Sequence, residues 1–99
     1  MGSMARIKMA EVIVTLKIMP VSPDIDLDDL KTKAKKIIKE AEGEIGKEYY
    51  EEIAFGIKAI ILIFIRNEAK GSVDDISDKI AEIEEVSSTE ITDVRRAIG

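Results

Sequence analysis

The most distinctive chemical groups of this chain lie in two short segments near its middle and its end. Residues 54–58 read Ala-Phe-Gly-Ile-Lys, which sets a large aromatic ring beside glycine and a cation just after them. Residues 92–96 read Thr-Asp-Val-Arg-Arg. A buried ring supplies interface energy, and Lys or Arg pairs with carboxylates or phosphates. The side chain of Phe55 has two interpretations: an exposed anchor for a partner, or a ring folded under its turn to cover the end of the core.

A third segment, residues 24–28, reads Asp-Ile-Asp-Leu-Asp and resembles the start of a calcium loop. Such a loop needs Gly at its sixth position and Glu at its twelfth. Those positions hold Asp29 and Lys35, so the pattern fails. Acids at this place are instead typical of a helix beginning, where a side chain caps the free amides and the helix dipole favours negative charge.

Composition excludes several classes of function. The 99 residues include no Cys and no His, which removes thiolate chemistry, the Ser-His-Asp arrangement and the usual zinc catalyst. No glycine-rich phosphate motif occurs, and we expect neither a metal nor a cofactor. Fifteen Lys and Arg against 20 Asp and Glu give a net charge of −5, which disfavours nucleic acid as a partner. We therefore expect a protein without covalent chemistry.

No membrane or targeting segment stands out. The apolar run at 11–19 contains Thr15 and Lys17 and stops at Pro20, too short and too interrupted for a span. We expect a cytoplasmic chain with an extension at 1–10, partly of artificial origin, and one domain at 11–99. Gln is absent and Asn67 is the only Asn, which hints at a thermophilic source.

Hydrophobic periodicity orders the elements behind these segments. Strands are expected where apolar residues alternate or are β-branched, and helices where they recur at a spacing of three and four. The predicted strands span 11–19, 44–54, 57–66 and 88–95, and the predicted helices span 26–42 and 72–86. The order βαββαβ with right-handed crossovers predicts an α+β, ferredoxin-like fold. Its four antiparallel strands would lie in the order 4-1-3-2, with both helices on one face.

This topology leads to a prediction about the two segments. We expect the connection between the second and third strands, at 53–58, to emerge at the same edge of the sheet as the Arg95-Arg96 tail.

The first predicted helix carries five lysines. A solvated helix face is the favoured interpretation of these lysines, and contact with an acidic partner or RNA is the alternative. These lysines are Lys31, Lys33, Lys35, Lys36 and Lys39.

Three stretches carry a resemblance to a known family. Val14–Leu30 (VTLKIMPVSPDIDLDDL), Ile53–Ile60 (IAFGIKAI) and Ile91–Ile98 (ITDVRRAI) resemble the archaeal translation elongation factor 1-beta family, and are similar to the exchange domain of its eukaryotic members. The resemblance covers roughly residues 11–98. It implies a ferredoxin-like fold and guanine-nucleotide exchange on elongation factor 1-alpha, the GTPase that delivers aminoacyl-tRNA.

The resemblance also implies a set of partner-binding residues. The Phe-Gly pair matches the family's contact with the GTPase, and the following Lys and the acid of the Thr-Asp pair match as well. Eukaryotic members place a near-terminal Lys close to the Mg²⁺ of the GTPase, and this chain has Ala97-Ile98-Gly99 there, so an Arg would have to take that role. The expected partner-binding residues are Phe55, Gly56, Lys58, Asp93, Arg95 and Arg96. A competing hypothesis is a small regulatory or assembly domain whose apolar positions at 57–66 form a dimer or ligand-binding face.

Overall fold

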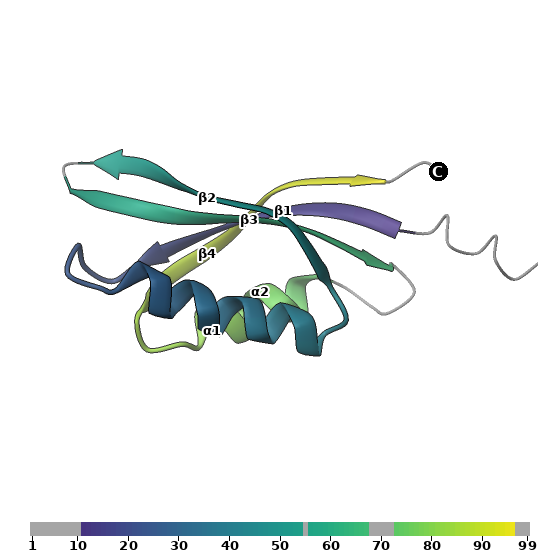
Figure 1. Cartoon of the computed structure of the whole chain (residues 1–99), viewed down its shortest axis with the longest axis horizontal. Coiled ribbons are helices and arrows are strands. Elements are labelled where there is room, and N and C mark those ends of the chain that lie inside the picture. The colour runs from purple at the N-terminus through teal and green to yellow at the C-terminus, as the bar shows by residue number, and fades with distance from the viewer. Residues whose placement is uncertain (1–10, 55, 68–72, 97–99) are drawn as a thin grey trace, which may run out of the picture.

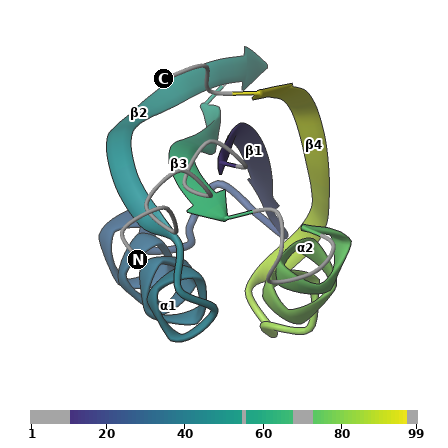
Figure 2. The same ribbon diagram turned by 90° about the vertical axis from the view of Figure 1, so that its right-hand side faces the viewer.

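The computed structural model describes residues 11–54, 56–67 and 73–96. Its elements follow the predicted order: β1 (Glu11–Pro20), α1 (Leu27–Glu40), β2 (Glu44–Ala54), β3 (Ile57–Asn67), α2 (Asp74–Ala81) and β4 (Val86–Arg96). The four strands form one antiparallel sheet in the order β2-β3-β1-β4, which is the predicted order counted from the other edge. Both helices lie on the same side of this sheet (Figures 1 and 2). The ferredoxin-like prediction is confirmed.

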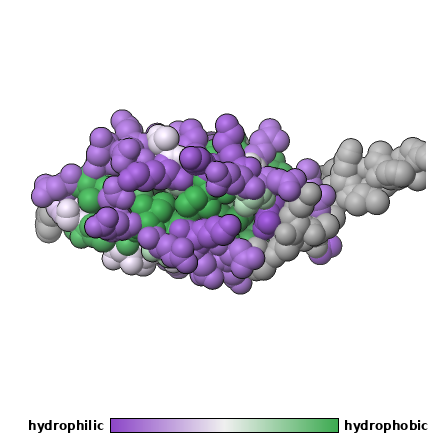
Figure 3. Space-filling view, turned by 90° about the horizontal axis from the view of Figure 1, so that it is seen from below, coloured by the Kyte–Doolittle hydropathy of each residue, from purple (hydrophilic) through white to green (hydrophobic). Residues whose placement is uncertain are grey.

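The core lies between the sheet and the two helices. Alternate residues of β1 and β3, among them Leu16, Leu62 and Phe64, point toward the helices and are buried. They meet the apolar stripes of both helices, such as Leu30 of α1 and Ile76 of α2. On this side of the molecule the remaining apolar surface forms a stripe bordered by hydrophilic side chains (Figure 3). Burial of these side chains contributes roughly 1.5–3 kcal/mol each for the larger ones.

Helix α1 has a defined beginning and end. The Asp26 carboxylate accepts hydrogen bonds from the amides of Asp28 and Asp29, which confirms a cap from the acidic segment. At the other end the amide of Gly43 donates to the carbonyl of Ile38, the pattern of a Schellman motif. The left-handed residue of that motif is Glu42 (φ 65°) rather than the glycine. Gly43 is needed for space, because a Cβ there would lie 2.7 Å from Ile38 Cγ2.

The second helix is shorter than the sequence predicts. We expected a helix over 72–86, but α2 ends at Ala81 and is followed by tight turns, in which Ile83 and Val86 donate to carbonyls three residues earlier. Val86 is instead the first residue of β4, opposite Pro20, so its apolar side chain belongs to the sheet. The expected capping residue Ser72 lies outside the described residues. Among the described residues, Val73 occupies the cap position and makes no side-chain hydrogen bond.

The strand register contradicts the predicted meeting of the hairpin and the arginine tail. Strand β1 is antiparallel to both of its neighbours, so β3 and β4 run parallel and begin at the same end of the sheet. Pro20 pairs with the first residue of β4, whereas Val12 pairs with Arg96. The hairpin therefore lies at the end where β4 begins, and the tail emerges from the opposite end (Figure 1). The error was to place the start of β3 at the same end as the finish of β4.

Candidate partner-binding site

The β2–β3 connection is a tight turn at one end of the molecule. Ala54 and Ile57 face each other across it, and Gly56 has φ 72°, a left-handed conformation that glycine adopts without a steric penalty. The predicted glycine is thus explained by the backbone. Phe55 lies outside the described residues, so the two interpretations of its side chain both remain predictions.

Exposed apolar groups surround this turn. Residues 51–54 of β2 are all exposed. Ile53 is 38% exposed, and Val21, which follows β1 at the same end, is 54% exposed. Lys58 is exposed as well and pairs in register with Glu52, yet within the described part of the chain it forms no salt bridge. The exposure of Val21 and Ile53 could not be predicted from the sequence, because alternation alone does not show where a hairpin extends beyond the helices.

The other predicted residues, Asp93, Arg95 and Arg96, lie at the end of β4, where this strand pairs with the start of β1. Arg95 Nε donates to Asp93 Oδ2 at 2.9 Å, and both side chains are well exposed. Arg95 pairs in register with Ile13, and Arg96 pairs with Val12. Because neighbouring residues of a strand point to opposite faces, the two arginines serve different faces of the sheet. Asp93 therefore orients Arg95 alone.

The two groups of predicted residues are well separated. Arg66 of β3 pairs with Val12, which also pairs with Arg96, so the tail lies level with Arg66. The strand path from Lys58 to Arg66 is about 26 Å at roughly 3.3 Å per residue. The predicted cluster of the hairpin with the two arginines is therefore wrong. The predicted residues instead fall into two groups, one at each end of the sheet.

The lysines of α1 are used mainly in ion pairs with neighbouring elements. Lys31 and Lys35 contact Glu48 of β2 at 3.1 and 2.7 Å, and Lys33 contacts Glu85 at 2.8 Å. Hydrogen bonds from Lys35 and then Lys31 hold the pKa of Glu48 below its ordinary value. Lys33 lowers the pKa of Glu85 in the same way. The basic helix thus ties the helical layer to the sheet and to the loop before β4.

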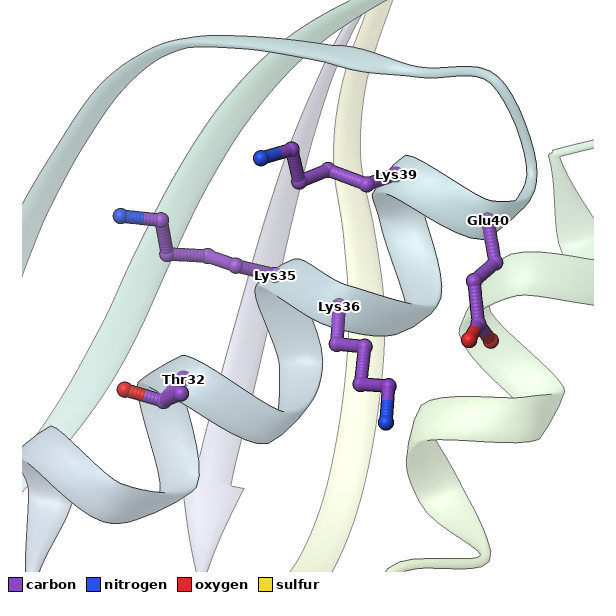
Figure 4. A pocket seen from close by; sticks show the side chains of 5 residues that line it. All are labelled: Thr32, Lys35, Lys36, Lys39 and Glu40. Atoms are coloured by element: carbon purple, nitrogen blue, oxygen red, sulfur yellow. The ribbon is translucent and has the colours of Figure 1, made fainter.

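A shallow hollow of about 460 Å³ lies on the outer side of α1 between Thr32 and Glu40. Lys35 and Lys39 extend to one side of the helix, whereas Lys36 and Glu40 extend to the other (Figure 4). The ammonium groups therefore do not converge on one point, and a carboxylate stands beside them. This geometry agrees with the solvated-face interpretation of the helix.

Tyr50 connects β2 to the first turn of α1. Its hydroxyl donates to Asp28 Oδ1 at 2.5 Å, and Lys31 Nζ lies 5.0 Å from the centre of its ring. The hydrogen bond to the Asp28 carboxylate raises the pKa of the Tyr50 phenol.

Within residues 11–54, 56–67 and 73–96, acidic side chains form no cluster suited to a metal ion. No helix in the same residues is long and apolar enough to span a membrane.

Comparison with known proteins decides the family. Residues 13–97 match the family model of the EF-1 guanine nucleotide exchange domain, which is nearly the whole chain. The chain belongs to this exchange-domain family. The elongation factor 1-beta of Methanobrevibacter smithii is 47% identical over 88 residues, covering 89% of this chain and 98% of that protein. The elongation factor 1-beta of Methanothermobacter thermautotrophicus is 40% identical with the same coverage, and that of Methanocaldococcus jannaschii is 36% identical over 90% of this chain and all of that protein.

Solved structures agree on the fold. The crystal structure of the ACT domain from the GTP pyrophosphokinase of Chlorobium tepidum superimposes with a TM-score of 0.57, covering 82% of this chain and 97% of that one. At 18% identity this likeness concerns the fold alone. The family match makes the chain a guanine-nucleotide exchange factor of archaeal translation elongation. It does not favour the competing hypothesis of a regulatory or assembly domain.

Proposed function

We propose that this exchange domain accelerates GDP release from elongation factor 1-alpha by docking on the GTPase with both ends of its sheet. The hairpin end would use Phe55, Gly56 and Lys58. The tail end would use Arg95, oriented by Asp93, together with Arg96. The observation that carries this proposal is the strand register, which separates the two groups by about 26 Å along the sheet.

Surface chemistry supports the hairpin end as an anchor. Val21 and Ile53 are exposed apolar residues at the same end of the sheet as Gly56, and apolar side chains gathered on a surface are typical of protein interfaces. The left-handed conformation of Gly56 fixes where the backbone reverses. This end would supply affinity rather than act on the nucleotide.

Charge supports the tail end as the part that acts near the nucleotide. A guanidinium remains positive at all working pH values and binds phosphate or replaces a cation beside it. The ion pair with Asp93 holds Arg95 at the open face of the sheet, while Arg96 lies toward the other face. Since the terminal Lys of eukaryotic members is missing, Arg95 is our candidate for its role.

Such a factor makes and breaks no covalent bond. It stabilises the conformation of the GTPase that holds GDP and Mg²⁺ weakly, and linkage requires GDP to weaken binding of the factor equally. A coupling of about 4 kcal/mol corresponds to roughly a thousandfold change in affinity. GDP, GTP and Mg²⁺ would be bound by the partner and not by this chain. The chain would act in the cytoplasm, and its net charge of −5 argues against direct binding to nucleic acid.

The decisive experiment measures release of fluorescent GDP from an archaeal elongation factor 1-alpha with and without this chain. Phe55→Ala and Arg95→Ala should each slow stimulated release, and Phe55→Ala should weaken binding more than Arg95→Ala does. Because the two sites lie far apart, the losses in binding free energy should add within about 0.5 kcal/mol in the double variant.

Arg96→Ala removes an equal charge from the adjacent residue on the opposite face, and it should slow release less than Arg95→Ala, because only Arg95 is assigned the role near the nucleotide. If Arg96→Ala slows release as much as Arg95→Ala, the assignment of Arg95 is wrong. If the double variant departs strongly from additivity, the two ends do not dock independently. Absence of any stimulation by the native chain would refute the proposed function itself.

A further inference from the structure

A small hollow lies at the hairpin end, between the turn and the loop that leads into α1. It has a volume of about 230 Å³ and is lined by Pro20, Ser22, Pro23, Leu27, Gly56 and Lys58. The lining comes from the end of β1, the following loop, the start of α1 and the start of β3. Figure 1 shows the hairpin and the β1–α1 loop at the same end of the molecule.

The walls of this pocket are mostly apolar, and two of the lining residues are prolines, whose rings fix the backbone and leave little freedom to lose on binding. Within the β1–α1 loop, the Ser22 hydroxyl accepts a hydrogen bond from the amide of Asp24 at 3.2 Å. The amide of Val21 donates to the carbonyl of Glu85 at 2.9 Å, which ties the loop to the segment before β4. These contacts hold the loop in place without a partner.

The rim of the pocket carries one cation. Lys58 is exposed and forms no salt bridge within the described part of the chain, although the net charge of the protein is −5. An ammonium group above apolar walls suits a ligand that combines an apolar body with a negative charge beside it.

We infer that this pocket receives an apolar side chain of the GTPase that is flanked by a carboxylate, with the carboxylate paired to Lys58. The inference rests on the proposed function, since it deepens the role of the hairpin end. Gly56 is part of the pocket lining, and the exposed Val21 lies in the chain between the lining residues Pro20 and Ser22. An apolar anchor in a preformed pocket is the arrangement that gives interfaces most of their affinity.

The test fills the pocket and leaves its cation, Lys58, in place. Ser22→Leu places an isobutyl group in the hollow, and the matched control Ser87→Leu makes the same change at an exposed position of β4 that does not line it. Isothermal titration calorimetry with elongation factor 1-alpha should give at least tenfold weaker binding for Ser22→Leu and native binding for Ser87→Leu. Circular dichroism checks that both variants fold.

A second variant keeps the inference testable if Ser22→Leu does not fold. Lys58→Met retains the length of the side chain and removes its charge, so it should weaken binding and reduce the dependence of affinity on salt. Native affinity and native salt dependence in Lys58→Met, or native binding of a folded Ser22→Leu, would overturn the inference. If the pocket variants bind like the native chain while Phe55→Ala does not bind, the inference about the pocket fails and the proposed role of the hairpin stands. If the native chain itself does not bind, both the inference and the proposed function are refuted.

Discussion

The three described glycines of the sheet region provide a graded test of the backbone geometry. A methyl group at Gly43 would meet Ile38 Cγ2 at 2.7 Å and Phe64 Cδ2 at 3.2 Å, and both of these side chains are fully buried. Relief requires the core to shift, and overpacking of this kind costs about 1–3 kcal/mol. For a domain of this size, Gly43→Ala should lower Tm by about 5–20 °C.

The other two glycines are matched controls that separate crowding from conformation. At Gly56 no atom lies within 4 Å of the added methyl, but φ is 72°, so Gly56→Ala should cost roughly 1–2 kcal/mol through backbone strain alone. At Gly46 the nearest atom is 3.9 Å away and no positive φ is present. Gly46→Ala should therefore be neutral or stabilise by about 0.4–1 kcal/mol.

Urea unfolding followed by far-ultraviolet circular dichroism gives all three free energies of unfolding, and an unchanged m-value confirms that the same surface is exposed. The free energy of unfolding is expected to be highest for Gly46→Ala, lower for Gly56→Ala and lowest for Gly43→Ala. Equal stability of Gly43→Ala and Gly46→Ala would show that the contact with Ile38 relaxes freely, and the crowding argument would fail.

Three further predictions concern the ties between α1 and its neighbours. Glu48→Gln should lower the stability of the fold by about 0.5–1 kcal/mol at pH 7 in thermal unfolding, whereas Glu84→Gln should not. Because the pKa of Glu48 is lowered in the folded state, its contribution to stability is present above the ordinary value of 4.5. The difference between Glu48→Gln and the native chain should therefore vanish as the pH falls through the folded pKa. Asp26→Ala should cost about 0.5–2 kcal/mol in urea unfolding through loss of the helix cap, and an equal loss in Asp24→Ala would contradict that assignment. Because the pKa of Tyr50 is raised in the folded state, its neutral hydroxyl stabilises the fold below pH 10, and this stabilisation is lost as the pH rises through the folded pKa. Tyr50→Phe should therefore flatten the decline in Tm above pH 10. An unchanged decline in Tm would argue against this role of Tyr50.

The main elements of the fold could be predicted because local patterns determine them. Alternation in β1 and the helical spacing in α1 gave bounds within one or two residues. The end of α2 could not be predicted, because Ile83 and Val86 continue the helical spacing although tight turns and the pairing with Pro20 decide the structure. Local sequence carries no signal for that pairing.

The candidate site was predicted residue by residue but placed incorrectly. The structure shows a contact between Asp93 and Arg95 and a left-handed conformation at Gly56, and the binding role of these residues stays a prediction. The relative position of the two segments depends on strand direction throughout the sheet, which must be followed strand by strand. The pocket beside Lys58 was not predicted, because its walls come from three elements that periodicity treats separately.

Strand β1 pairs with β3 along one side and with β4 along the other, so these two ladders together set the distance between the two proposed docking ends. A change of register by two residues would move one end by about 7 Å while leaving every buried side chain on its face. If both ends dock as proposed, the number of paired residues between them decides whether they can reach the GTPase at the same time.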